Sequence, residues 1–204
     1  MENRDLENRF YDRGASAVFL KTRERFGGLS NMAGGYPIFV NSTSILTSEA
    51  LYQACRFPYS PNIQRLIISE RSPMTAKMRS KPYRSETRAD WDRQRVPIMR
   101  WCLRAKLICN FDSFSSVLLS TGDAPIVEMK TKGADFWGAS LQDNNYLVGP
   151  NVLGRLLMEL REEVRNNESS RFEHIKPLPI KDFLLFGEPI GVVKKQHSKQ
   201  TLFG

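Results

Sequence analysis

The spacing of apolar and polar residues predicts a mainly helical chain with a few short strands. Residues 17–22 (AVFLKT) and 36–46 (YPIFVNSTSIL) are rich in β-branched and aromatic residues, which is typical of strands. The turn residues 41–43 (NST) divide the second run into a hairpin. Residues 25–35 (RFGGLSNMAGG) form a glycine-rich loop that either brings backbone N–H groups to a ligand or is only a connection. A further strand is expected at residues 126–129.

Helical spacing dominates the rest of the chain, and most helical segments carry a start signal. A capping side chain or a proline at the first helical position marks where a helix begins. Residues 87–110 also have a helical period, but Pro97 must kink that helix or mark its true start. The clearest helix is residues 151–164 (NVLGRLLMELREEV), which should pack on the core. The start signals are Thr47 or Ser48, Ser72 with Pro73, Asp112, and residues 149–151 (GPN), and a further short helix is expected from about Asn62.

These elements predict an α+β fold, mainly helical, built as one compact domain with a few short strands. The 204 residues suit a single domain, and 41% hydrophobic with 25% charged residues is a globular composition. We divide the chain into an N-terminal segment with the first strand (1–25), a central domain (26–166) and a C-terminal extension (167–204). The extension should dock partly on the domain and then fray. Residues 135–145 (DFWGASLQDNN) are expected to be a polar loop.

The net charge of +8 is concentrated in one part of the chain. Residues 61–110 contain twelve Lys or Arg and four Asp or Glu, so this basic segment alone carries +8, and the rest of the chain balances. A basic segment of this kind attracts phosphates, whether in nucleic acid, a dinucleotide or an anionic cofactor. The alternative is a solvated basic face without a specific partner.

The start of the chain is charged, and no run approaches the roughly 18 apolar residues of a membrane span. We therefore expect no secretion signal and no membrane partner. Three cysteines without a CxxC pair argue against disulfides and against a zinc site. A cytoplasmic protein with reduced thiols, with the nucleus as the alternative, fits this pattern, and no metal or cofactor is expected.

Glu49, Gln53 and Arg56 are spaced by four and three residues, so they share one face of the short helix in residues 47–57 (TSEALYQACRF). The residues alone leave two interpretations open. The stripe is either a solvated helix face or the lining of a pocket. As a solvated residue, Glu49 would only stabilise the helix N-terminus, by about 0.3 to 1 kcal/mol.

Seven stretches, read together and in order, resemble the NADAR superfamily. This "NAD and ADP-ribose" family includes N-glycosidases of bacterial riboflavin metabolism and enzymes that remove ADP-ribose from guanine. The resemblance extends from about residue 26 to residue 165. The stretches are GGLSN, TSEALYQACRF, SPMTAKMRSKP, DWDRQRVPIMRWCLRAKL, VLLSTG, DFWG and NVLGRLLMELR.

The resemblance implies a compact, mostly helical domain with a pocket for a ribosyl nucleotide. It also implies hydrolysis of a bond between a nitrogen and the anomeric carbon of ribose. The substrate would be an ADP-ribosyl or phosphoribosyl conjugate, such as ADP-ribosylated guanine, carried by DNA or RNA, or a riboflavin precursor. Such a bond breaks through an oxocarbenium-like state, which needs a carboxylate near the anomeric carbon and a proton for the leaving nitrogen.

Carried over residue by residue, the resemblance gives Glu49 the role of acid/base or of holding the ribose hydroxyls, with Asp135 as a second catalytic carboxylate. Gly138 permits a tight turn, and the Trp137 indole could stack on a base. Asn151, beside a helix N-terminus, could contact an anion. The proposed substrate-binding residues are Ser30, Asn31, Gln53, Arg56, Lys81, Trp91, Trp137, Gly138 and Asn151.

Arg56 departs from the family pattern, in which many members have a lysine that has been proposed to form a Schiff base with the opened ribose. A guanidinium stays protonated and is a poor nucleophile. The chain must then use another lysine, hydrolyse by direct water attack, or bind without turnover. Lys77, Lys81 and Lys106 are the substitutes to test; Lys81 and Lys106 could equally be phosphate contacts or surface residues.

Three functions follow from these observations. The first is an N-glycosidase whose basic segment grips phosphates. A second is a non-catalytic module that binds ADP-ribose or a related nucleotide, which the Arg56 replacement favours. The third is a nucleic-acid-binding protein that uses residues 61–110 on backbone phosphates.

Overall fold

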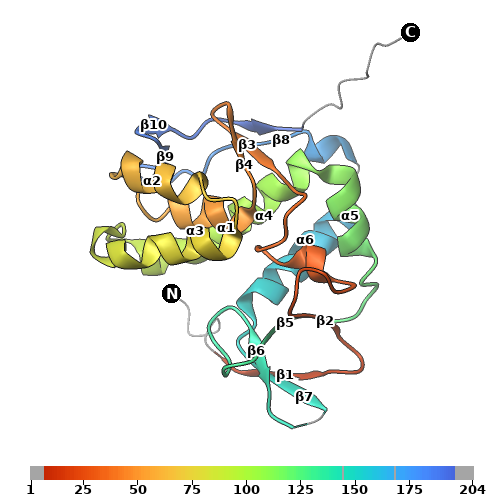
Figure 1. Cartoon of the computed structure of the whole chain (residues 1–204). Helices are drawn as coiled ribbons and strands as arrows, with labels where there is room; N and C mark the ends of the chain where they lie inside the picture. The colour runs from red at the N-terminus through yellow and green to blue at the C-terminus, as the bar shows by residue number, and fades with distance from the viewer. Residues whose placement is uncertain (1–6, 144, 168, 196–204) are drawn as a thin grey trace.

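The structure, a computed structural model, describes residues 7–143, 145–167 and 169–195 (Figure 1). These residues form an α+β fold, mainly helical, which confirms the predicted fold class. Helices α1 to α3 lie together at one side of the molecule, and the largest sheet lies at the opposite end, with α6 between them (Figure 1).

The largest sheet has five strands in the order β1-β7-β6-β5-β2. The pairs β2 with β5 and β5 with β6 are parallel, whereas β6 with β7 and β1 with β7 are antiparallel. The helix α6 (Val152–Asn166) packs against β5. The strands are β1 (Arg9–Asp12), β2 (Ala17–Phe19), β5 (Ile126–Lys130), β6 (Ala139–Leu141) and β7 (Tyr146–Gly149).

Part of this sheet differs from the sequence-based expectation. The predicted polar loop at residues 135–145 contains β6 and leads into β7, and β1 was not expected at all. These strands are only three or four residues long, and β1 is exposed at three of its four positions. Three or four residues are too few to show the alternation of apolar and polar positions that identifies a strand. Such short strands are stabilised by pairing with their neighbours, which the local sequence does not reveal.

The predicted hairpin is confirmed by β3 (Ile38–Val40) and β4 (Thr43–Ile45), which pair antiparallel. Asn41 and Ser42 form the two-residue turn with φ of 46° and 62°. Positive φ at both central residues is the type I′ geometry, whose twist matches that of the flanking strands.

The helices begin where local capping chemistry allows. Thr47 Oγ1 accepts from the Ala50 N–H, and Ser72 Oγ accepts from the Thr75 N–H, which confirms both predicted caps. The Asp112 prediction is wrong, because Asn110 holds the N-cap position. The helices are α1 (Ser48–Ala54), α2 (Pro61–Ile68), α3 (Pro73–Ser80), α4 (Trp91–Cys109), α5 (Phe111–Leu119) and α6, with the 3-10 helix η3 (Lys81–Glu86) after α3.

The helix α4 begins at Trp91, so Pro97 lies inside it and does not mark its start. A proline there removes one intrahelical hydrogen bond, and burial of the face that carries Ile98, Trp101 and Cys102 compensates for that loss.

The segment 169–195 packs on the domain. Strand β8 (His174–Ile175) pairs with β11 (Val193–Lys194), and β9 (Leu184–Leu185) pairs with β10 (Glu188–Pro189). Gln64 on α2 donates to the Leu184 carbonyl and accepts from the Phe186 N–H, which fastens the segment to the helices. Its buried side chains include Phe183, Leu185, Ile190 and Val193. The expected fraying concerns residues 196–204, outside the described part of the chain.

Candidate active site

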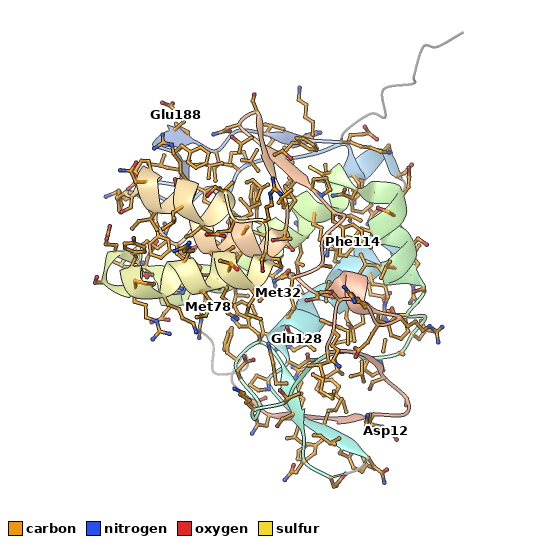
Figure 2. The ribbon with its side chains drawn as sticks, viewed as in Figure 1. Asp12, Met32, Met78, Phe114, Glu128 and Glu188 are labelled. Carbon is orange, nitrogen blue, oxygen red and sulfur yellow. The ribbon has the colours of Figure 1, made fainter. Side chains whose placement is uncertain are left out.

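A cavity of about 310 Å³ lies where α1, α3 and α4 meet strand β5 and the glycine-rich loop. Figure 2 shows Met32 and Glu128, two of its lining residues, between the helical side and the sheet end of the molecule. The lining combines two carboxylates, several cations and three aromatic rings. It consists of Asn31, Met32, Glu49, Tyr52, Gln53, Arg56, Lys77, Arg84, Trp91, Arg95, Met99, Glu128, Lys130, Trp137 and Leu153.

Glu49 is held from two sides. Its backbone N–H donates to the Asn31 carbonyl oxygen at 3.1 Å, which joins the first turn of α1 to the glycine-rich loop. Its Oε1 accepts a hydrogen bond from Gln53 Nε2 at 3.0 Å. The residue is only 5% exposed, so its carboxylate is oriented inside the cavity.

Gln53 connects Glu49 to the other residues of the predicted stripe. Its Oε1 accepts from Ser80 Oγ at 2.9 Å and from Arg56 Nη1 at 3.2 Å. Arg56 Nη2 also donates to Thr87 Oγ1 at 3.0 Å. The stripe Glu49, Gln53 and Arg56 therefore lines a pocket, and the alternative of a solvated helix face is excluded.

Arg56 is half-buried, and its guanidinium carbon lies 5.2 Å from the centre of the Trp91 ring, a cation–π distance. Burial is the main cause that lowers the pKa of Arg56 from its usual value. This contact keeps the positive charge of Arg56 at the cavity wall, beside the Trp91 ring.

Three aromatic rings form one wall. The centre of the Tyr52 ring lies 5.1 Å from that of Trp91 and 5.7 Å from that of Trp137, the latter in an edge-to-face arrangement. Burial, with the charge of Glu49 second, raises the pKa of Tyr52 well above its usual range, so the phenol is neutral. An aromatic wall of this kind offers ring faces and edges on which a base or another planar ring can pack.

Glu128 is a second cavity carboxylate that the sequence reasoning missed. Its Oε2 lies 2.9 Å from Lys130 Nζ, which is also 3.5 Å from Asp135 Oδ2. Burial is the main cause that raises the pKa of Glu128; the charges of Asp135 and Glu49 add to the rise, and Lys130 acts against it. The signal that could have found Glu128 is its place on the predicted strand 126–129, two residues before Lys130, a spacing that puts both side chains on one face of an extended chain.

Asp135, predicted as catalytic, lies outside the cavity lining and is exposed. Its Oδ1 accepts from the N–H groups of Trp137 and Gly138, both at 2.9 Å, so it shapes the turn that presents the indole. Gly138 is required there, because a Cβ atom would lie 2.5 Å from the Glu128 carbonyl oxygen.

Asn151 and Ser30 also lie outside the cavity lining. Asn151 is fully buried with φ of 48°, and its side chain donates to the Ile126 carbonyl and accepts from the Glu128 N–H. It therefore positions β5. Ser30 Oγ accepts from the Met32 N–H at 3.1 Å, which shapes the glycine-rich loop.

The candidate lysines are separated by the fold. Lys77 lines the cavity, and Lys81 is exposed in η3 outside the lining. Lys106 is fully buried and donates to the carbonyl oxygens of Gly28 and Ser30. Both interpretations offered for Lys106 from the sequence, a surface residue and a phosphate contact, are therefore wrong.

The basic segment does not form one continuous cationic face. Only three of its cations, Lys77, Arg84 and Arg95, line the cavity. Other members are neutralised by ion pairs, which the structure shows as Arg79–Glu70, Arg88–Asp90, Arg100–Glu159 and Arg104–Glu163.

Within residues 7–143, 145–167 and 169–195, no group of three or more His, Cys, Asp or Glu side chains could hold a metal ion. In the same described residues, no helix is both long and apolar enough to cross a membrane.

Known proteins resemble the part of the chain that builds the cavity. The sequence model of the NADAR domain matches residues 18–165. The N-glycosidase YbiA of Escherichia coli is 34% identical over 149 residues, which cover 72% of this chain and 86% of YbiA. An N-glycosidase of Nostoc punctiforme is 33% identical over 150 residues, covering 72% of this chain and 92% of that protein.

The fold is shared as well. The NMR structure of Escherichia coli YbiA matches with a TM-score of 0.62 and 31% identity, over 74% of this chain and 86% of that structure. A riboflavin biosynthesis protein of Vibrio vulnificus is 34% identical over 151 residues, covering 73% of this chain and 38% of that protein.

Proposed function

Because the chain belongs to the NADAR family, we propose that it is an N-glycosidase that hydrolyses the bond between a nitrogen and ribose C1 in an ADP-ribosyl or phosphoribosyl conjugate. The observation that carries the proposal is the position of Glu49, a buried and oriented carboxylate that lines a cavity beside Tyr52, Trp91 and Trp137. An oxocarbenium-like transition state at C1 needs a carboxylate at close range.

The cations of the cavity support a substrate that carries phosphate. Lys77, Arg84 and Arg95 line the same cavity as Glu49, and Arg56 adds a fourth positive group. Guanidinium and ammonium groups bind phosphate oxygens through charge-assisted hydrogen bonds. Both ADP-ribosyl and phosphoribosyl conjugates provide such oxygens, whereas an unphosphorylated nucleoside does not.

Direct attack by water requires no nucleophilic lysine at position 56; among the substitute lysines, Lys77 lines the cavity and is the alternative nucleophile. Arg56 replaces the lysine of a Schiff-base route, and its guanidinium is committed to Gln53 and Thr87. Lys130 also lines the cavity; burial acts to lower its pKa, but the neighbouring Glu128 and Asp135 raise it, which disfavours a neutral, nucleophilic amine. Glu49 would then accept the proton of the water that attacks C1.

Product release measured by mass spectrometry tests the proposal. The protein is incubated with DNA that carries ADP-ribosylated guanosine and, separately, with a phosphoribosylamine precursor of riboflavin. We expect free ribose-bearing product from at least one substrate, lost in Glu49→Gln and retained in Glu159→Gln, which changes a carboxylate on the outer side of α6.

The two alternative functions predict different results in this experiment. A module that only binds nucleotides would release no product from either substrate while still binding ADP-ribose. A nucleic-acid-binding protein would bind unmodified DNA with a steep dependence on salt and with no effect of Glu49→Gln.

A further inference from the structure

Glu128 and Glu49 reach the same cavity from different parts of the fold. Glu49 is on α1, at the helical side, whereas Glu128 is on β5, in the sheet (Figures 1 and 2). Two carboxylates that flank a ligand from separate elements are the arrangement by which glycosidic bonds are hydrolysed with an acid and a base.

The backbone around Glu128 is fixed. Its N–H donates to Asn151 Oδ1 at 3.1 Å, and its carbonyl oxygen lies against Gly138, where a Cβ atom would come within 2.5 Å. The preceding residue, Val127, is fully buried in a second small core. The backbone that carries the Glu128 side chain into the wall of the cavity is therefore fixed.

The immediate surroundings of the Glu128 carboxyl group leave it incompletely paired. Its side chain is 17% exposed, and Oε2 lies 2.9 Å from Lys130 Nζ without a hydrogen bond of good geometry. The Lys130 ammonium is shared with Asp135, so it only partly compensates Glu128. Burial raises the pKa of Glu128; Lys130 acts against this rise, and the charges of Asp135 and Glu49 add to it, so the carboxyl group gives up its proton less readily than an ordinary glutamate.

We propose that Glu128 is the general acid of the reaction and protonates the leaving nitrogen, while Glu49 takes the proton of the attacking water. This inference rests on the proposed N-glycosidase function. It assigns different roles to the two carboxylates, as expected when their surroundings differ.

The proton and electron balance is complete without a further reactant. The C1–N bond breaks, its electron pair stays on the nitrogen, and the nitrogen takes the Glu128 proton. Water forms the new C1–O bond and gives a proton to Glu49, and one proton then returns through solvent from Glu49 to Glu128. The net change is one water consumed, one amine and one ribose hydroxyl formed.

The assignment also defines the leaving group. An exocyclic amine or another neutral nitrogen leaves as a strong base, so it requires a proton. A pyridinium nitrogen leaves as a neutral ring and requires none. The acid on β5 therefore indicates a substrate whose ribose is attached to an amine-type nitrogen.

The test measures how the rate depends on the leaving group. A series of N-(5-phosphoribosyl)anilines, from weakly to strongly basic amines, is hydrolysed by the wild-type protein, Glu128→Gln, Glu128→Asp and Glu49→Gln. General acid catalysis contributes on the order of 10² to 10⁴ in rate. We expect Glu128→Gln to lose about 10²-fold or more on the most basic amine and much less on 4-nitroaniline, whereas Glu49→Gln slows all members similarly.

Glu128→Asp serves as the control for structure, because it retains a carboxyl group near Lys130. It should keep the shallow dependence on amine basicity, and the thermal unfolding midpoints of the variants show whether they fold. Formate should partly restore the rate of Glu128→Ala on basic amines. If Glu128→Gln slowed the hydrolysis of every amine by the same factor, the dependence of the rate on amine basicity would be unchanged. That result would overturn the assignment of Glu128 but not the proposed glycosidase function. No hydrolysis of any aniline by the wild-type protein would overturn the glycosidase proposal with it.

Discussion

Lys106 Nζ donates a 2.6 Å hydrogen bond to the carbonyl oxygen of Gly28 from the fully buried part of α4. It also donates to the Ser30 carbonyl at 3.1 Å, and the next residue, Asn31, accepts from the Glu49 N–H. The lysine thus anchors the loop that lines the cavity and fixes the start of α1.

Replacing this lysine should destabilise the fold. Lys106→Met keeps the apolar stem but leaves the carbonyl oxygens of Gly28 and Ser30 without their donor. An unsatisfied buried group costs about 1 to 3 kcal/mol, so we expect a loss of about 2 to 4 kcal/mol in the free energy of unfolding. Urea denaturation measures the free energy of unfolding. Lys81→Met makes the same change at an exposed position and is the matched control.

The same variant gives a prediction for pH. Burial lowers the pKa of Lys106 to about 7, whereas the unfolded chain retains a value near 10.4. Between these values the unfolded chain binds more protons, so the contribution of Lys106 to stability increases with pH, by at most about 1.4 kcal/mol per unit. The stability difference between wild type and Lys106→Met should therefore grow from pH 7 to pH 9. A constant difference would contradict a lowered pKa.

Gln53 should act on catalysis through Glu49. Gln53→Ala removes the donor to Glu49 Oε1 and the acceptor of Ser80 and Arg56. A misplacement of about 1 Å can cost about 10²-fold in rate, so we expect kcat to fall about 10- to 100-fold with a smaller change in KM. Steady-state kinetics measures both, and Gln142→Ala, on an exposed loop, should be unchanged. An unaltered kcat in Gln53→Ala would exclude this positioning role.

The cations of the cavity should determine affinity for phosphate. Lys77→Ala and Arg84→Ala should each weaken ADP-ribose binding by up to about fivefold at low salt, since a solvated ion pair contributes up to about 1 kcal/mol. The loss should shrink as salt screens the interaction. Isothermal titration at two salt concentrations measures it. Arg23→Ala, an exposed cation outside the cavity lining, is the comparison. Equal effects of all three variants would indicate binding to net charge alone.

The C-terminal segment should contribute to the stability of the domain. Phe183 is buried, and its ring centre lies 5.0 Å from that of Trp101 in an edge-to-face contact. Phe183→Ala should lower the free energy of unfolding by about 3 to 5 kcal/mol. Val192→Ala, at a 48% exposed position in the same segment, should change it by about 0.5 kcal/mol or less. Urea denaturation measures both free energies of unfolding. A loss in Phe183→Ala as small as that in Val192→Ala would mean that the segment is not part of the core.

Features set by neighbours in sequence could be predicted. Thr47 and Ser72 cap their helices with hydrogen bonds three residues away, and the Asn41-Ser42 turn depends on residues that tolerate positive φ. The stripe Glu49, Gln53 and Arg56 was visible as helical spacing, but only the fold shows that it faces a cavity.

Features set by distant contacts could not be predicted. Glu128 lines the cavity because β5 pairs with β2 and β6, and neither pairing is written in the local pattern. Asn151 was assigned an anion contact from its place beside a helix N-terminus, and Asp135 a catalytic role from the resemblance of the DFWG stretch. In the fold their hydrogen bonds go to the backbone of β5 and to the turn before β6.

The most direct test of the glycosidase account is the single-turnover rate of C1–N cleavage in Glu49→Gln, measured together with the affinity for ADP-ribose. The amide keeps the size of the side chain but cannot accept a proton from water. The account predicts a rate about 10³-fold below wild type with affinity nearly unchanged. A rate within about threefold of wild type would contradict it.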